Sequence, residues 1–419
     1  MMSLHDKIRA IGVAAKAAAR ELVRFSGDSR NEALLAMAEA IDASRAEIAA
    51  ANAVDVAAAA AAGLSPALID RLTLTEARVD GVIKGLREVA ALPDPLVRNL
   101  GTVVRPNGLE IVKQPVPIGV IAIIFESRPN VTADAAALCV KSGNAVILRG
   151  GKEALNSNKA IAAAMAAGIR KAGLPDNTVQ LITTLDHAAV TELVRMDDCI
   201  DVVIPRGGES LIRAVVQNAR VPVLKHYNGI CHIYVDESAD FPEALEIIHN
   251  AKCQRPGTCN AVETVLVNEK IAAAFIPVLA EKCRAWGVAV KADAASRAFA
   301  DGFESATEED WTNEYLSLKM SLAVVAGVDA AIAHINRYGS HHSDAILTRD
   351  DAVARKFTCE VDSAAVYVNA STRFTDGGEF GMGCEMGIST DKLHARGPVG
   401  IEELTTYKYV VHGNGQVRK

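Results

Sequence analysis

The sequence predicts an α/β protein of two lobes, each built on a doubly wound parallel sheet. The first observation is that, from Val120 onward, short apolar segments alternate with helical ones, which is typical of parallel strands joined by helices. The second is that the same alternation starts again after Cys259. The third is size, because 419 residues, 50% of them apolar, exceed one ordinary domain and can fill two or three cores.

The chain before the first strands is helical in composition. Residues 3 to about 90 are rich in Ala, Glu and Arg and predict two or three long helices. The alanine run 57–62 continues such a helix, Gly63 ends it, and Ser65-Pro66 begins the next one. We therefore expect a helical N-terminal region in front of the first lobe.

The elements of the two lobes follow from apolar runs and helical periodicity. In the first lobe we expect strands at 120–125, 145–148, 179–182, 202–204 and 233–235, and helices at 154–171 and 208–219. In the second lobe we expect strands near 263–267, 322–325, 344–347 and 365–368, and helices near 269–285 and 328–337.

Two further segments alternate loosely between apolar and polar residues, as an exposed strand does. They are 109–116, which lies between Asn107-Gly108 and Pro117, and the tail 405–411. An exposed, β-branched strand needs a partner chain or charge to avoid aggregation. We therefore expect both segments to be edge strands.

Composition narrows the classes of partner. The net charge of −7 is modest and no basic cluster occurs, which argues against nucleic acid and anionic membrane and favours a small-molecule substrate. No apolar run is long enough to span a bilayer and the N-terminus lacks a signal-peptide core, so we expect a cytoplasmic protein. Eight cysteines without a C-x-x-C pair predict free thiols, with no metal site and no disulfide framework.

Cys259 lies between a Gly-Thr turn and an apolar strand, in the run Gln254–Thr264. A thiol held at the mouth of a rigid sheet is well placed to act as a nucleophile. The alternative is a small buried hydrophobic residue, which is what most cysteines in such chains are. The residues around it leave both interpretations open.

Asn130 stands where the strand 120–125 ends and a helix begins, and strand ends of this kind are where ligands bind. The side chain could simply cap the helix, which is the more common role. It could instead donate to the oxyanion of an acyl group on a nearby sulfur.

Two glycine turns follow strands of the first lobe. Arg149-Gly150-Gly151-Lys152 offers close backbone approach and positive charge for a phosphate, and Gly207-Gly208 offers helix amides for a pyrophosphate. Neither is a G-x-G-x-x-G fingerprint, and no Walker A motif occurs. Each glycine pair alone is also an ordinary turn.

The segment His334–Ile346 is dense in histidine and contains Arg337, His341 and His342. Solvation at the surface, capping and metal binding are alternatives. Adjacent histidines on an extended chain point to opposite sides, so one metal ion is not expected to use both. A loop that binds an anion fits better.

Together these residues resemble the aldehyde dehydrogenase superfamily and, within it, the family of γ-glutamyl phosphate reductases, also called glutamate-5-semialdehyde dehydrogenases. The resemblance covers nearly the whole chain and is most specific at Phe125–Val131, Gln254–Thr264 and His334–Ile346. It implies an aldehyde dehydrogenase-like fold with a small β oligomerisation element. It implies a nucleophilic thiol at Cys259, with oxyanion donors from Asn130 and from the Cys259 backbone. It also implies NADPH or NADP contacts at Arg149, Lys152, Gly207, Gly208 and Glu314.

The activity implied is NADPH-dependent reduction of L-glutamyl 5-phosphate to L-glutamate 5-semialdehyde through a thioacyl enzyme, the second step of proline biosynthesis from glutamate. Hydrolytic relatives place a general-base glutamate in a segment like Leu224–Ile230, but this chain has no acidic residue between Glu209 and Asp236. Without that base, water competes poorly for a thioacyl enzyme. The alternatives are a hydrolytic or CoA-dependent aldehyde dehydrogenase and a non-catalytic protein on the same fold.

The resemblance also implies a division of the chain. Residues 1–106 and 118–238 would form the cofactor-binding domain, 239–375 the catalytic domain, and 107–117 with 390–419 an oligomerisation element and tail. A homodimer or larger assembly is expected, and glutamate 5-kinase, which would make the labile acyl phosphate, is a candidate partner. Arg337, His341 and His342 are expected to recognise the anionic substrate.

Overall fold

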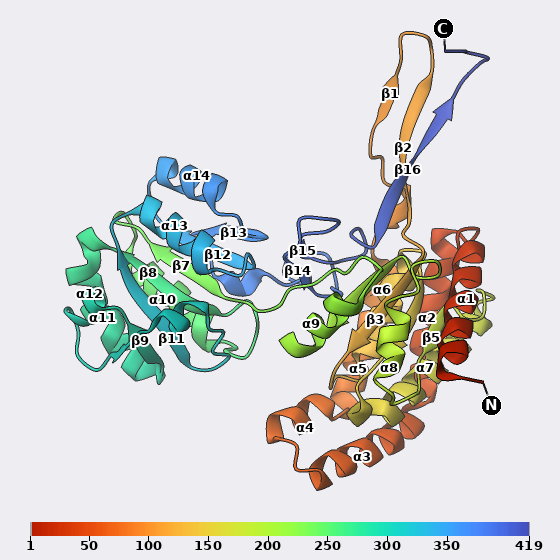
Figure 1. Ribbon diagram of the computed structural model, residues 1–419, viewed down its shortest axis with the longest axis horizontal. Coiled ribbons are helices and arrows are strands. Elements are labelled where there is room, and N and C mark those ends of the chain that lie inside the picture. The colour runs from red at the N-terminus through yellow and green to blue at the C-terminus, as the bar shows by residue number, and fades with distance from the viewer. Residues whose placement is uncertain (1, 419) are drawn as a thin grey trace. The chain divides into compact units, whose positions relative to one another are not determined.

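The computed structural model describes residues 2–418, which form two compact units (Figure 1). The first unit runs to Lys225 and also takes in Gly381–Gly387 and the chain from Val399 onward. The second unit consists of His226–Phe380 and Ile388–Pro398.

Between residues 2 and 91 of the described chain, five helices are present rather than the two or three predicted. They are α1 (Leu4–Leu22), α2 (Gly27–Ala43), α3 (Arg45–Ala61), α4 (Pro66–Leu72) and α5 (Glu76–Ala91). Short polar residues divide the region because their side chains accept bonds from the first turn of the next helix, as Ser26 and Thr75 do. Gly63 adopts a left-handed φ of 73° after α3, so the predicted end of the alanine run is confirmed.

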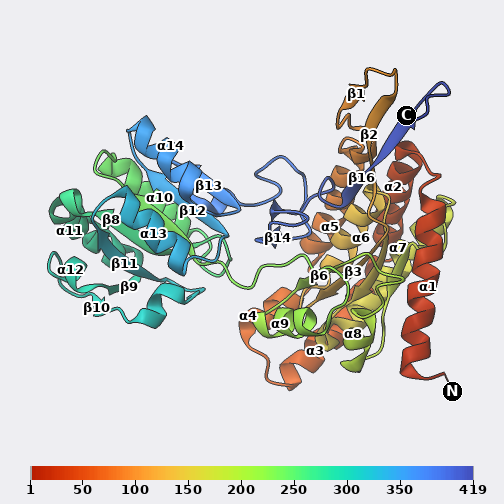
Figure 2. The ribbon, with the colours of Figure 1, turned by 45° about the horizontal axis from the view of Figure 1, so that its top comes forward.

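The sheet of the first unit is parallel, with strand order β5-β4-β3-β6. Its elements are β3 (Val120–Phe125), α6 (Val131–Lys141), β4 (Ala145–Arg149), α7 (Leu155–Lys171), β5 (Val179–Leu181), α8 (Ala188–Leu193), β6 (Val202–Arg206) and α9 (Glu209–Asn218). Alternate residues of β3 share one core with residues of α1, and α6 and α7 contact the sheet as well. Figure 2 shows α1 and α7 beside this sheet. All six side chains of β3 are buried, as a strand between two layers of helix requires.

The sheet of the second unit is also parallel, with order β10-β9-β11-β8-β7-β12-β13. Its strands are β7 (Cys231–Val235), β8 (Val262–Asn268), β9 (Ala289–Ala292), β10 (Glu304–Ser305), β11 (Lys319–Val325), β12 (Ser343–Leu347) and β13 (Ala365–Val368). Helices α10 (Phe241–Cys253) and α11 (Glu269–Trp286) pack in one core. Helices α13 (Val328–Tyr338) and α14 (Asp351–Glu360) pack in another, so the predicted two-lobed α/β class is confirmed.

The assignment of 233–235 to the first lobe was wrong. This segment belongs to β7, which pairs with β8 and β12 in the second sheet. The first unit accordingly ends at Lys225, before the expected boundary at 238. Part of the expected tail also lies in the second unit, where β14 (Ile388–Ser389) pairs with β15 (Gly397–Pro398).

A three-stranded antiparallel sheet, which we call the β-arm, projects from the first unit (Figure 1). It consists of β1 (Thr102–Val104), β2 (Glu110–Pro117) and β16 (Thr405–His412), with β2 in the middle. Both predicted segments are therefore strands, and β2 and β16 pair with each other along their full length. The prediction of an edge strand is correct for β16 but wrong for 109–116, because β2 lies between β1 and β16. Apolar side chains stay exposed on the arm, among them Val104, Tyr409 and Val411.

Within residues 2–418, no helix is both long enough and apolar enough to cross a membrane.

Candidate active site

The loop between α10 and β8 presents Cys259, whose side chain is half-buried. Bonds on both sides of the cysteine fix this loop. The Thr258 hydroxyl donates to the Arg255 carbonyl at 2.9 Å, and the Asn260 amide donates to the Thr375 carbonyl at 2.9 Å. The thiol is therefore held in place without being part of the core, which favours the nucleophile over the buried hydrophobic residue.

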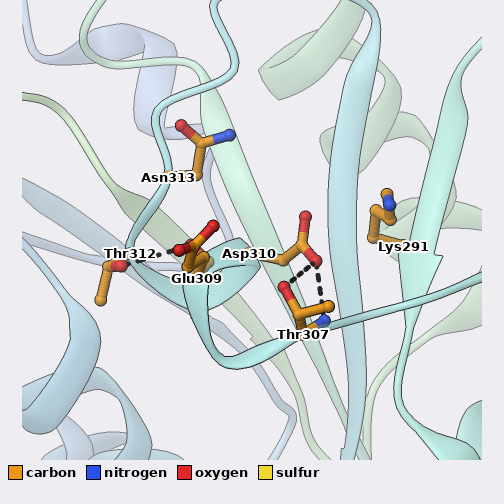
Figure 3. Close-up of a pocket in the computed structure, with 6 residues that line it drawn as sticks. All are labelled: Lys291, Thr307, Glu309, Asp310, Thr312 and Asn313. Carbon is orange, nitrogen blue, oxygen red and sulfur yellow. Dashed lines mark hydrogen bonds between the residues drawn. The ribbon is translucent and has the colours of Figure 1, made fainter.

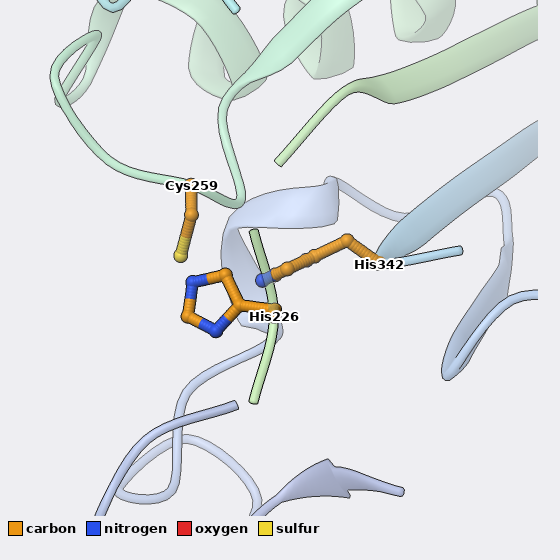
Figure 4. Close-up of side chains that lie close together, drawn as sticks. All are labelled: His226, Cys259 and His342. Atoms are coloured by element: carbon orange, nitrogen blue, oxygen red, sulfur yellow. The ribbon is translucent and has the colours of Figure 1, made fainter. Parts of the chain in front are cut away.

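Two imidazoles lie beside Cys259, one from His226 and one from His342 (Figure 4). One ligand atom from each of the three side chains lies within 4.8 Å of the others. The imidazole rings meet edge to face, with centroids 5.5 Å apart. We call these three residues the Cys-His-His cluster.

His226 has a defined orientation because its Nδ1 donates to the carbonyl of Ile388 at 2.8 Å. Since a carbonyl only accepts, Nδ1 carries the proton and the lone pair of the neutral ring lies on Nε2. Figure 4 shows this other nitrogen directed toward the sulfur of Cys259. His226 is thus placed to take the thiol proton. It was missed as a site residue, although it lies in the segment 224–230 in which the sequence lacks the glutamate base.

His342 is fully buried immediately before β12, and its Nδ1 lies 2.9 Å from the Ser343 hydroxyl. Burial, with a smaller contribution from His226, lowers the pKa of His342 to about 3. The ring is therefore neutral at physiological pH. Its Nε2 is buried and has no hydrogen-bond partner among the described residues.

Cys231 on β7 supports the nucleophile's backbone. Its thiol donates to the carbonyl of Cys259 at 3.2 Å and lies 3.8 Å from His342 Nδ1. Burial raises the pKa of Cys231 well above its usual value, so this thiol stays protonated. No sequence pattern distinguishes Cys231 from the other buried cysteines.

Gly229 lets two backbone segments meet at the cluster. A Cβ at this position would lie 1.7 Å from the carbonyl oxygen of Cys259, so no larger residue fits without movement. The Gly229 amide donates to the carboxylate of Glu314 at 2.9 Å. Glu314, a predicted cofactor residue, is thereby located beside the segment that contacts Cys259.

A buried ion pair lies on the elements that flank the Cys259 loop. Lys252 Nζ on α10 donates to Glu263 Oε2 on β8 at 2.7 Å, and both side chains are 0% exposed. Burial raises the pKa of Glu263 to about 7 and lowers that of Lys252, and the attraction between the two groups opposes both shifts. The other oxygen of Glu263 accepts from the Leu316 amide at 3.4 Å, near Glu314.

A polar pocket of about 460 Å³ is lined by residues that precede Glu314 in the sequence (Figure 3). Its lining residues are Lys291, Thr307, Glu309, Asp310, Thr312 and Asn313. The amide and hydroxyl of Thr307 donate to Asp310 at 2.7 and 2.8 Å, so part of the lining is bonded internally. Cys259 is not part of this pocket.

Of the three residues expected to recognise the substrate anion, only His342 joins the cluster. Arg337 is exposed at the end of α13, bonds to Glu308 at 3.1 Å and lies over the ring of Tyr338. His341 donates to the Asp362 carbonyl at 2.5 Å and has a left-handed φ of 59°. The histidine-rich loop therefore contributes one residue to the cluster, beside His226 from a distant segment.

In the first unit, Asn130 stands at the N-cap position of α6, but its side chain does not cap the helix. Its backbone is helical, its side chain makes no capping bond, and its amide donates instead to Asp134 at 2.8 Å. The capping interpretation was therefore wrong. Burial raises the pKa of Asp134 to about 6, against the opposing effect of the bond from Asn130.

Backbone amides and cations of the first unit meet at the carboxyl ends of β3, β4 and β6. Lys152 is exposed, whereas Arg149 is buried and donates to the Gly150 carbonyl at 3.1 Å. The Gly208 amide, at the start of α9, donates to the carboxylate of Glu126 at 2.9 Å. In other proteins an amide at the start of a helix can donate to a phosphate, whereas here it donates to a carboxylate. Gly207 lies exposed beside the same carboxylate.

Known proteins that are similar to this chain identify its family. The model of the aldehyde dehydrogenase family matches residues 3–298. The γ-glutamyl phosphate reductase of Geotalea daltonii is 51% identical over 418 residues, the full length of both chains. The crystal structure of γ-glutamyl phosphate reductase from Thermotoga maritima has a TM-score of 0.97 at 48% identity, with 98% of this chain and 100% of that chain covered.

More distant relatives have the same fold. The γ-glutamyl phosphate reductase structure from Saccharomyces cerevisiae is 33% identical, with a TM-score of 0.56 and complete coverage of both chains. An acetylating aldehyde dehydrogenase from Geobacillus thermoglucosidasius has a TM-score of 0.68 at 19% identity, covering 99% of this chain and 98% of that one, which shows the fold alone. The chain belongs to the aldehyde dehydrogenase family and, within it, to the γ-glutamyl phosphate reductases.

Proposed function

We propose that this protein reduces L-glutamyl 5-phosphate to L-glutamate 5-semialdehyde and phosphate with NADPH, in the second step of proline biosynthesis. The observation that carries the proposal is the fixed Cys259 loop with His226 beside the thiol, on a chain 51% identical to a γ-glutamyl phosphate reductase. A base next to a cysteine in a rigid loop is what covalent acyl transfer requires.

In the proposed first step, His226 Nε2 takes the proton of the Cys259 thiol as the sulfur attacks the acyl carbon. A carbon–sulfur bond forms, the carbon–oxygen bond to the phosphoryl group breaks, and phosphate leaves. The Cys259 backbone N–H would stabilise the oxyanion that develops, and we assign the second donor to Asn130. His342, neutral and buried, would keep a second imidazole beside the reacting sulfur.

Residues of the first unit would hold most of the cofactor. Arg149, the last residue of β4, and Lys152, which follows the strand, provide positive charge. The amides near Gly207 and Gly208 are assigned to the pyrophosphate, which would displace the Glu126 carboxylate from the Gly208 amide. Glu314 is assigned to the nicotinamide ribose, to which a carboxylate can accept two hydroxyl bonds. When bound, NADPH supplies the hydride that reduces the thioester. The thiohemiacetal anion would then collapse: the carbon–sulfur bond breaks, the aldehyde leaves, and the sulfur regains the proton held by His226. The departed phosphate would take its proton from solvent.

The reverse reaction tests the proposal directly. Purified protein with glutamate semialdehyde and NADP⁺ is expected to produce NADPH only when inorganic phosphate is present. NADPH formation that proceeds without phosphate would indicate a hydrolytic enzyme, and a requirement for CoA would indicate a CoA-acylating one. Either outcome would contradict the proposed function.

His226→Asn is expected to lower kcat by about 100-fold near pH 7, the lower end of what general-base catalysis contributes. Asparagine retains an N–H that can donate to the Ile388 carbonyl but offers no base to the thiol. The deficit should shrink as the pH approaches the ordinary thiol pKa of about 8.5, because the thiolate then forms without help. A pH–rate profile between pH 6 and 9 measures this. A deficit that stays constant across the range would assign His226 a structural role only.

Lys152→Ala is expected to weaken NADPH binding by about 10- to 100-fold while changing NADH binding little, because a charge-assisted bond to the 2′-phosphate would be lost. Lys152 is the sharper of the two tests, since Arg149 is buried and its replacement would also disturb packing. Fluorescence titration with both nucleotides measures the effect. Lys159→Ala, an exposed lysine on α7, is the matched control. Equal losses for NADPH and NADH would contradict the assignment.

We also propose a homodimer or larger assembly formed through the β-arm, whose exposed apolar residues and free strand edge would otherwise favour aggregation. Sedimentation at micromolar concentration tests this, and a stable active monomer would contradict it. We also propose a cytoplasmic location. An encounter with glutamate 5-kinase is proposed because an acyl phosphate is labile in water.

A further inference from the structure

We propose that the Cys-His-His cluster is also a binding site for a zinc-like divalent cation, which reversibly blocks the nucleophile. A thiolate and two imidazoles are ligands that Zn²⁺ prefers over the hard cations Mg²⁺ and Ca²⁺. The ligand atoms of His226, Cys259 and His342 already lie within 4.8 Å of one another. Three protein ligands leave a fourth position for water, the composition of an open zinc site.

The spacing of the three atoms is close to what coordination needs. Zinc–sulfur and zinc–nitrogen bonds of about 2.3 and 2.0–2.1 Å in tetrahedral geometry place ligand atoms roughly 3.3–3.6 Å apart. Contraction from a separation of at most 4.8 Å therefore requires a movement of the order of 1 Å. Side-chain rotation at the half-buried Cys259 and His226 can supply it.

Both histidines are arranged as metal ligands are. A ligating histidine usually gives its second nitrogen to a carbonyl or another polar group, which fixes the ring. His226 Nδ1 donates to the Ile388 carbonyl at 2.8 Å, and His342 Nδ1 lies 2.9 Å from the Ser343 hydroxyl. The Ser343 hydroxyl is itself 2.5 Å from that of Thr375, so the side chain that contacts His342 is held by a further hydrogen bond.

The remaining nitrogen of His342, Nε2, is independent evidence for a bound ligand. His342 is 0% exposed, and its Nε2 has no hydrogen-bond partner among the described residues. A buried polar atom left without a partner costs about 1–3 kcal/mol. Figure 4 shows the tip of this ring directed toward the other two side chains. A cation bound between the three residues would complete its coordination.

Binding replaces the thiol proton by the metal ion and releases that proton to solvent. The sulfur lone pair is then shared with the cation and cannot attack an acyl carbon. The binding claim concerns these three side chains alone, whereas the inhibitory consequence rests on the proposed function of Cys259. The sequence patterns for zinc sites did not predict this one, because its ligands are 33 and 83 residues apart.

Cobalt titration of chelator-treated protein tests the binding claim without any activity measurement. Co²⁺ is expected to produce near-ultraviolet sulfur-to-metal charge-transfer absorption together with visible bands of a tetrahedral site, and Zn²⁺ should abolish both by competition. Cys259→Ser should remove the charge-transfer band. His226→Asn and His342→Asn should each weaken affinity by about 100-fold or more, because losing even an outer-shell partner costs 10- to 100-fold.

Cys359→Ser, a change at an exposed thiol on α14, is the control and should leave the cobalt spectrum intact. Circular dichroism establishes that each variant is folded, and His226→Asn, at a half-buried position, serves if the buried His342 variant is not. A charge-transfer band that survives in Cys259→Ser, or a cobalt affinity unchanged in a folded histidine variant, would overturn the proposal.

Inhibition is measured separately, with Zn²⁺ added to the phosphate-dependent assay and removed by EDTA. Loss of activity with Zn²⁺ and recovery with EDTA are expected in the wild-type protein. If the protein lacks reductase activity, the proposed function fails while the cobalt spectrum still decides whether the site exists. Inhibition by Zn²⁺ without the cobalt–thiolate band would place the inhibitory ion elsewhere and contradict the site.

Discussion

Cys259→Ala is expected to reduce turnover by a factor of about 10⁴ or more, since a covalent route without its nucleophile keeps only binding and electrostatic contributions. This corresponds to about 5 kcal/mol of lost transition-state stabilisation. NADPH should still bind, because the residues assigned to its phosphates lie in the first unit and Cys259 lies in the second. Single-turnover kinetics and a fluorescence titration of NADPH separate the two effects. Parallel loss of turnover and NADPH affinity would indicate a folding defect instead.

Alkylation gives a second measure of the same thiol. Cys139, Cys199, Cys231 and Cys283 are buried, and burial raises the pKa of each. Cys359 is exposed on α14 and therefore reports the reactivity of an accessible thiol outside the cluster. Iodoacetamide should label Cys259 before Cys359 in time-resolved mass spectrometry. Equal rates would contradict activation by His226.

Local patterns in the sequence predicted most of the strands because buried parallel strands are short, continuous apolar runs. Strand β3 has the predicted bounds of 120–125, and β13 has those of 365–368. The parallel class follows, since such runs alternate with helices. The Cys259 loop was identified for the same reason, as its Gly-Thr turn leads directly into the apolar run of β8.

Strand partners were harder to predict because pairing is not a local property. The run 231–235 is fully buried and would suit either sheet. Only its register with β8 and β12 places it in the second unit. The N-terminal helices were predicted as two or three for a related reason. Residues with high helix propensity continue almost without interruption through the short polar caps that separate α1–α5.

The nucleophile's neighbours could not be predicted from spacing. His226 and His342 lie 33 residues before and 83 residues after Cys259. The fold brings them together because the segments that carry them lead into β7 and β12, which are neighbouring strands of one sheet. Asn130 illustrates the opposite error, in which a common local role was assumed although the side chain bonds to Asp134 one turn later.

Lys252→Met is expected to lower the free energy of unfolding by about 3–5 kcal/mol at neutral pH, the range for breaking a buried ion pair by removing one partner. Glu263 would then keep its burial but lose the attraction and the hydrogen bond from Lys252. Loosening Glu263 would also disturb the segment at Leu316, which follows Glu314. Denaturant titration of the wild type and the variant measures the difference in unfolding free energy.

The destabilisation by Lys252→Met should depend on pH in a defined direction. Burial raises the pKa of Glu263 to about 7 even beside Lys252, and loss of the lysine raises it further. The folded state therefore holds a proton that the unfolded chain releases above its pKa of about 4.3, so stability falls as pH rises between these values. We expect the loss to be smallest near pH 5 and largest near pH 8. The double variant Lys252→Met/Glu263→Gln, which removes the buried charge, should recover much of the stability and lose this pH dependence. A loss in the single variant that is equal at pH 5 and pH 8 would contradict an uncompensated carboxylate as its cause.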